Sequence, residues 1–152
     1  MPRGTRTIPP ACLARCRSAD AILHAGDLTA LAVLELLRSL GPPVHAVRGN
    51  VDAPELAAVL PERLVVGAEG LRIGMIHDGG PRADRLRRLR GAFPDADAVV
   101  FGHSHMPEHA AADGFQIFNP GSATERRRAP HCTMGLARVR DRQIAFELVS
   151  LP

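Results

Sequence analysis

Five polar residues that could bind a metal ion each follow a short apolar run. They are Asp27, Asn50, His77, His103 and His105. Apolar runs of this kind, such as residues 73–76 and 98–101, are typical of buried strands. Because an α/β sheet gathers such polar groups at the carboxyl ends of its strands, we expect the five side chains to converge. Carboxylate, carboxamide and imidazole groups together suit Mn, Fe, Zn, Co or Ni better than Ca or Mg. The sequence therefore predicts a catalytic metal site.

Composition limits the classes of function that need to be considered. The length of 152 residues predicts a single domain, residues 1–152. With five Phe and no Tyr or Trp, recognition of single-stranded nucleic acid by stacking is disfavoured. The net charge of +3 is compatible with an anionic substrate. The arginines of segment 85–90 fit a solvated helix face better than a surface for an anionic substrate. Nucleic-acid binding by arginine-rich segments has no recognised motif behind it.

The sequence also predicts a cytoplasmic location. No apolar stretch reaches the roughly 18 residues that a membrane span needs, and residues 1–10 contain no apolar leader segment. The three cysteines are an odd number, and Cys12 and Cys16 lie one helical turn apart. Reduced thiols in a reducing compartment explain them best.

Helical and strand patterns alternate in the first half, whereas the second half is mostly strand. This order predicts an α/β fold in which two sheets pack face to face and helices lie outside. We expect helices at residues 10–19, 28–40, 55–60 and 81–93. We expect strands at residues 20–25, 44–47, 64–66, 71–76, 98–101, 108–111, 114–118, 133–139 and 143–149.

Five segments, in this order and spacing, resemble the calcineurin-like metallophosphoesterase superfamily. They are Gly26-Asp27-Leu28, Gly49-Asn50-Val51-Asp52, His77-Asp78-Gly79, Gly102-His103-Ser104-His105 and Asn119-Pro120-Gly121-Ser122. The chain is most similar to the small bacterial and archaeal phosphodiesterases, a branch that includes the Vps29-type retromer subunit. The resemblance covers about residues 20–149. It implies the four-layer αββα sandwich of the metallo-dependent phosphatases and hydrolysis of a small phosphoester.

The same resemblance assigns roles to the five residues. In that family, two metal ions are bridged by an aspartate, here Asp27, and by a hydroxide that attacks phosphorus. Asn50, His77 and His103 then complete one metal shell, and His105 belongs to the other. The resemblance makes Asp27, Asn50 and His103 the catalytic residues and implies two divalent ions, manganese or alternatively Ni, Zn, Fe or Co.

One family feature is missing from the chain as it stands. The family begins with a strand that ends in Asp-x-His, which supplies further ligands of one metal. Residues 1–19 contain no Asp, Glu or His and no apolar run that could form this strand. We expect that the native protein begins further upstream and that Met1 is a late start. A true deletion, which would leave a one-metal or inactive protein, is the alternative.

A second departure concerns the proton donor. Where phosphomonoesterase-like branches of the family have a histidine, this chain has Val51, which cannot protonate a leaving group. Activated esters and phosphodiesters are therefore the expected substrates. Asp52 is expected to orient His103 or its own loop, and the turn at 119–122 to lie beside the metals. Arg48 or Arg126 is a candidate to contact the phosphate.

A different class of function also fits the resemblance. The chain could be a non-catalytic, protein-binding scaffold of the Vps29 type. The five ligand-type residues favour metal chemistry, and the missing Asp-x-His favours the scaffold. An apolar edge strand near the carboxyl terminus makes a homodimer a further expectation.

Overall fold

The computed structural model describes residues 7–152, and its first half alternates helices with short strands. In chain order these elements are α1 (Pro10–Arg17), β1 (Ile22–His24), α2 (Leu31–Ser39), β2 (Val44–Ala46) and α3 (Pro54–Val59). Proline begins both α1 and α3, where its fixed φ suits the first helical position. β1 and β2 pair in parallel, so the loops that follow them emerge at the same edge.

The second half contains one helix and the larger sheet. Its elements are β3 (Arg63–Ala68), β4 (Leu71–Ile76), α4 (Arg85–Ala92), β5 (Ala98–Val100), β6 (Glu108–Ala112), β7 (Phe115–Asn119), β8 (Thr133–Arg140) and β9 (Gln143–Ser150). Five of the strands form one sheet in the order β3-β4-β5-β7-β6, and β8 and β9 form a separate antiparallel hairpin. Within the sheet β4, β5 and β7 run parallel, which places their carboxyl ends along one edge.

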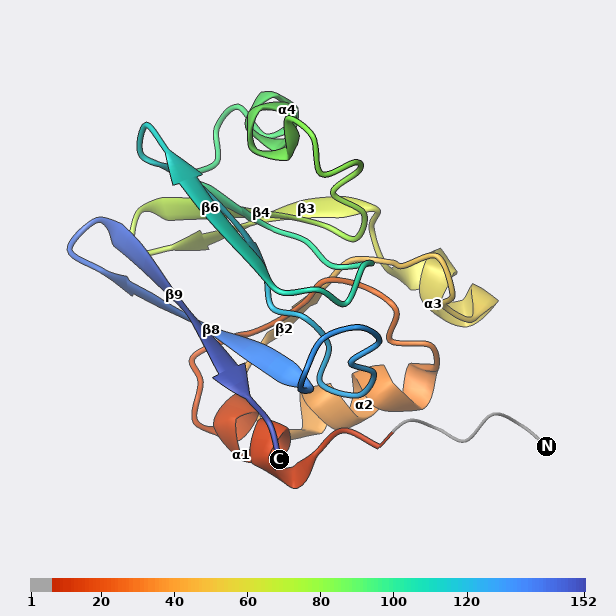
Figure 1. The fold of residues 1–152 in the computed structure, drawn as a ribbon. Helices are drawn as coiled ribbons and strands as arrows, with labels where there is room; N and C mark the ends of the chain where they lie inside the picture. The colour runs from red at the N-terminus through yellow and green to blue at the C-terminus, as the bar shows by residue number, and fades with distance from the viewer. Residues whose placement is uncertain (1–6) are drawn as a thin grey trace.

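The elements stack in four layers (Figure 1). Helix α4 covers one face of the five-stranded sheet, and β2, β8 and β9 lie against the other face. Helices α1 and α2 form the outer layer below them. The predicted αββα arrangement of an α/β fold is confirmed, and no helix among residues 7–152 is long and apolar enough to cross a bilayer.

Three apolar clusters hold these layers together. The cluster between the sheets includes Val47, which directly follows β2, Met75 of β4 and Ile144 of β9. Leu34 of α2 and Leu56 of α3 belong to a second cluster, formed by the first half of the chain. In the third cluster, side chains of α4 pack on the outer face of the large sheet. Because buried apolar area is the main stabilising contribution, these clusters fix the relative positions of the two halves.

Two helices begin later than the sequence predicts. Helix α2 begins at Leu31 rather than at residue 28, because Asp27 and Thr29 have left-handed φ angles of 61° and 70°. Helix α4 begins at Arg85 rather than at residue 81, because Asp84 has a left-handed φ of 54°. Neither backbone conformation is compatible with a right-handed helix.

The region around β1 is sparsely paired. Within the described part of the chain, β1 pairs with β2 alone, and α1 rather than a strand precedes it. An open groove of about 620 Å³ separates Asp20, just before β1, from residues of β8 and β9. The second β layer therefore consists of two separate two-stranded pieces.

Candidate metal centre

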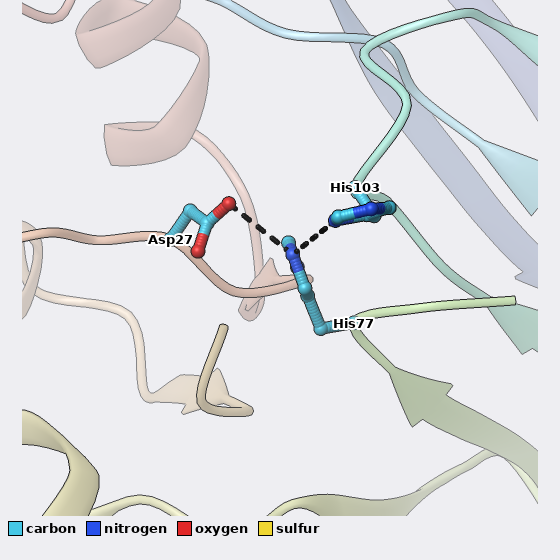
Figure 2. A group of neighbouring side chains, drawn as sticks. All are labelled: Asp27, His77 and His103. Atoms are coloured by element: carbon cyan, nitrogen blue, oxygen red, sulfur yellow. Dashed lines mark hydrogen bonds and ion pairs between the residues drawn. The ribbon is translucent and has the colours of Figure 1, made fainter. Parts of the chain in front are cut away.

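Four of the five predicted ligands meet at the edge where the strands end. Asp27, His77 and His103 offer ligand atoms that all lie within 4.8 Å of one another (Figure 2). His77 Nε2 lies 3.2 Å from Asp27 Oδ2 and 3.2 Å from His103 Nδ1. Asn50 joins them, since its Oδ1 lies 2.9 Å from His77 Nε2 and 3.2 Å from His103 Nδ1. The four side chains follow β1, β2, β4 and β5, as the sequence predicts.

The spacing of these four atoms fits a single bound ion. With a metal–nitrogen distance of about 2.1 Å, two ligands are about 3.0 Å apart at a right angle and about 3.4 Å apart at the tetrahedral angle. The four distances from a histidine nitrogen of the cluster lie between 2.9 and 3.2 Å, and Asp27 lies within 4.8 Å of His103. One carboxylate, one carboxamide and two imidazoles are therefore close enough together to share one transition-metal ion.

The orientation of His77 supports the same conclusion. Its Nδ1 donates to the carbonyl of Ala25 at 2.7 Å, so in a neutral ring Nε2 is an acceptor. That acceptor faces the side-chain oxygens of Asp27 and Asn50. Acceptors approach one another only across a cation, whether a proton or a metal. A backbone bond to the outer nitrogen is also how proteins usually orient a metal-bound histidine.

The pKa shifts of His77 and Asp27 in the metal-free site indicate the same position for the cation. Burial alone would lower the pKa of His77, but the hydrogen bonds to Asp27 and Ala25 outweigh it and raise the pKa. For Asp27, burial would raise the pKa, but hydrogen bonds from His77 and the backbone N–H of Val51 lower it. A proton on His77 thus occupies the place that a metal ion would take.

Three predicted site residues have strained backbones. Asp27, His103 and His105 have φ angles of 61°, 71° and 61°. A left-handed conformation at non-glycine residues costs free energy and is concentrated at functional sites. The strain points these side chains in directions that an ordinary strand end would not give.

The loops after β1 and β2 are fastened to each other by Asp52. Its Oδ1 accepts from the backbone N–H of Thr29 at 2.8 Å, and its Oδ2 accepts from that of Gly49 at 2.6 Å. Asp52 therefore orients the loops rather than His103, which decides between the two expected roles. Gly49 itself is required, because a Cβ there would overlap Oδ1 of Asp27.

The loop that carries His103 and His105 is fastened by Asn119. This fully buried side chain donates to the carbonyl of Gly102 and to Ser104 Oγ, both at 3.2 Å. Its Oδ1 accepts from the N–H of Gly121 at 2.9 Å. The turn at 119–122 thus lies beside the cluster, in agreement with the sequence analysis.

His105 lies outside the four-residue cluster. Its Nδ1 donates to the carbonyl of Glu125 at 2.9 Å and lies 3.6 Å from Glu125 Oε2. This leaves Nε2 as the acceptor nitrogen of a neutral ring. Burial lowers the pKa of His105, and the guanidinium of Arg127 lowers it further. The structure thus places His105 next to the cluster but in a separate set of contacts.

The arginines of α4 do more than form a solvated face, which corrects that expectation. Arg88 donates to the carbonyls of Gly79, Pro81 and Ala83, and Arg85 donates to the carbonyl of Gly80. These bonds hold the loop that follows His77. Within the loop itself, Asp78 adds one bond, because its Oδ1 accepts from the backbone N–H of Gly80 at 2.8 Å.

Neither arginine that the sequence analysis nominated for phosphate contact is oriented to the site by its contacts. Arg48 pairs with Glu62 at 3.7 Å, and Arg126 donates to the carbonyl of Ala129 at 3.0 Å. Arg127 instead donates to the carbonyl of His103 at 3.2 Å. Sequence reasoning missed Arg127 and Glu125, because residues 120–132 show no periodicity that would place them.

Comparisons with known proteins agree with this geometry. A family model described as the calcineurin-like phosphoesterase superfamily domain matches residues 4–142. A protein of Methanothermobacter thermautotrophicus named "Probable metallophosphoesterase" is 35% identical over 129 residues, which cover 84% of this chain and 74% of that protein. A protein of the same description from Methanocaldococcus jannaschii is 33% identical over 130 residues, covering 84% of this chain and 63% of that protein.

A solved structure shares the fold along the whole chain. Wild-type Vps29 of Entamoeba histolytica, in complex with zinc, matches with a TM-score of 0.76 and 25% identity. The match covers 99% of this chain and 93% of that one.

Proposed function

The chain belongs to the calcineurin-like phosphoesterase superfamily, and we propose that it is a metal-dependent phosphodiesterase with its active site at the Asp27–Asn50–His77–His103 cluster. The single observation that supports this most is the set of four ligand atoms, each of which lies 2.9–3.2 Å from at least one histidine nitrogen of the set. The family makes phosphoester hydrolysis the expected use of that set.

The proposed chemistry divides between the ion and the residues. A divalent ion at such a site lowers the pKa of water towards neutrality and polarises a phosphoryl oxygen. Asp27 and Asn50 supply oxygen ligands, and His77 and His103 supply nitrogen ligands. In the two-ion form that we propose, with manganese or a similar metal, Asp27 would serve both ions and Nε2 of His105 would hold the second.

The substrate class follows from what lies next to Asp27. The backbone N–H of Val51 donates to Asp27 Oδ1 at 3.0 Å, and its side chain is 56% exposed beside the cluster. An aliphatic side chain at this position offers no proton to a departing alkoxide. Esters with acidic leaving groups, such as aryl phosphodiesters, need no such proton.

The direct test compares two substrates in the presence of Mn²⁺. We expect fast hydrolysis of a bis-aryl phosphodiester, slow hydrolysis of an alkyl phosphomonoester, and loss of both activities in His77→Ala. Val51→His should accelerate the alkyl ester selectively, since it adds a proton donor. Absence of any metal-dependent hydrolysis by wild type would contradict the proposal, and equal rates on both esters would contradict the role of Val51.

A protein-binding scaffold is the second candidate, and the likeness to Vps29 favours it. Because that Vps29 structure contains zinc, metal binding does not distinguish the two candidates. Turnover does. A protein that binds Zn²⁺ or Mn²⁺ at the cluster but hydrolyses neither ester would support the scaffold.

A further inference from the structure

One arginine of the segment that follows β7 contacts the loop that carries His103. Residues 120–132 connect β7 to β8, and Arg127 of this segment donates through Nη1 to the carbonyl of His103. The ring of the same His103 contacts His77 and Asn50. The guanidinium therefore contacts the backbone of one of the proposed ligands, His103.

The other arginines considered for phosphate binding or for holding the site loops make different contacts. Arg48 contacts Glu62, and Arg126 contacts the carbonyl of its own turn at Ala129. Arg85 and Arg88 donate to the loop after His77. Arg127 differs because it contacts the loop that carries two of the proposed metal ligands, His103 and His105.

The position of the Arg127 guanidinium suits an anionic ligand. It contacts the backbone of His103, and its positive charge acts on the ring of His105, whose pKa it lowers. Its guanidinium carries five N–H groups, and one of them donates to a carbonyl among residues 7–152. The planar fork of the remaining groups matches two oxygens of a phosphoryl group.

We propose that Arg127 binds a non-bridging phosphoryl oxygen of the substrate and so sets the preference of the site for phosphate anions. This rests on the proposed function, because the substrate is taken to lie at the metal cluster. Arg127 then acts in binding, through its charge and its N–H groups, and it donates no proton to the leaving group.

The test uses inorganic phosphate as the probe and the Mn²⁺-loaded full chain. We compare Arg127→Gln, Arg127→Lys and the control Arg128→Gln, which removes a neighbouring exposed charge. Calorimetry should show phosphate affinity reduced about tenfold in Arg127→Gln, less in Arg127→Lys, and unchanged in Arg128→Gln. Mn²⁺ affinity should stay within about twofold of wild type in all three variants, because none of them changes a proposed metal ligand. A tenfold change in affinity would correspond to about 1.4 kcal/mol and would indicate that the ligands themselves had moved.

The outcomes separate this inference from the proposed function. If the wild type hydrolyses the ester and Arg127→Gln binds phosphate as tightly as the wild type does, the role of Arg127 is overturned and the proposed function is not affected. Loss of Mn²⁺ affinity in parallel with phosphate affinity would show that Arg127 only positions the His103 loop, which also overturns it. Weaker phosphate binding in Arg127→Gln, in a protein without esterase activity, would support Arg127 and contradict the proposed function.

Discussion

The two halves of the metal cluster are supported in different ways. Asp27 and Asn50 follow β1 and β2, two strands of three residues that pair only with each other in the described chain. His77 and His103 follow β4 and β5, which lie inside a five-stranded sheet. The nitrogen ligands thus have a continuous backbone support, and the oxygen ligands do not.

Side-chain hydrogen bonds take the place of that support in the first half. Asp52 fastens the two oxygen-ligand loops to each other through Thr29 and Gly49. In the second half, the parallel pairing of β4, β5 and β7 already fixes the loop positions, and Asn119 adds to it. A change in one side chain should therefore affect metal binding more in the first half than in the second.

The largest effect should come from adding one methyl group at Gly49. Gly49→Ala places a Cβ on Oδ1 of Asp27. We therefore expect the free energy of unfolding to fall by roughly 2–3 kcal/mol and most of the metal binding to be lost. Gly74→Ala, which crowds the Phe93 ring in the large sheet, should lower stability but keep the metal. Gly67→Ala is the control, because nothing lies within 4 Å of its added Cβ. Metal titration and chemical denaturation measure both quantities.

The second test removes one fastening side chain from each half. Asp52→Ala loses two hydrogen bonds of a charged acceptor, and we expect about 2 kcal/mol of destabilisation with a more than tenfold loss of Mn²⁺ affinity. Asn119→Ala leaves buried partners unsatisfied and should cost about 2–3 kcal/mol, but with a smaller loss of Mn²⁺ affinity. If Asn119→Ala weakens the metal more than Asp52→Ala does, the contrast between the halves is wrong.

The third test is a pH titration of one histidine from each half. Burial lowers the pKa of His24, at the end of β1, to about 4, whereas the pKa of His77 is raised above its ordinary value of 6.5. His24 therefore removes stability as the pH falls from 6.5 towards 4, because the unfolded chain binds the proton more readily. His77 contributes stability below pH 6.5 and loses it as the pH rises through its raised pKa.

Imidazole resonances of the metal-free protein report both values, with His24→Gln and His77→Gln for assignment. Because Mn²⁺ must displace the proton of His77, its affinity should rise about tenfold per pH unit until that pKa is passed. A Mn²⁺ affinity that does not change with pH between about 5.5 and 7.5, one unit either side of the ordinary histidine value, would contradict the assignment of His77 as a ligand.

The smallest effect is expected at the arginine that holds the His77 loop. Arg88→Met removes the bonds to the carbonyls of Gly79, Pro81 and Ala83, which should cost about 1 kcal/mol and weaken Mn²⁺ binding only a few-fold, since β4 still positions His77. Arg87→Met, an exposed position on the same helix, is the control. A loss of metal as large as that of Asp52→Ala would show that the large sheet does not support its ligands independently.

Sequence reasoning predicted the parts of the site that are encoded by strand ends. Asp27, Asn50, His77 and His103 each follow an apolar run, and the parallel order of the strands is enough to bring them together. The start of α2 was wrong because the left-handed φ at Asp27 and Thr29 cannot be read from a leucine periodicity. Arg127 and Glu125 were missed because their positions depend on where an irregular segment crosses the His103 loop, which is a property of tertiary packing.

The central claim is that two loops of the weakly paired half and two of the large sheet hold one divalent ion. A crystal structure of the protein grown with Mn²⁺ or Zn²⁺, with anomalous diffraction data, tests it directly. We predict an anomalous peak about 2.1 Å from His77 Nε2 and from His103 Nδ1, with Asp27 Oδ2 and Asn50 Oδ1 completing the shell. A second peak at Nε2 of His105 would add the two-ion form. Bound metal whose only peaks lie away from these four atoms would contradict the account.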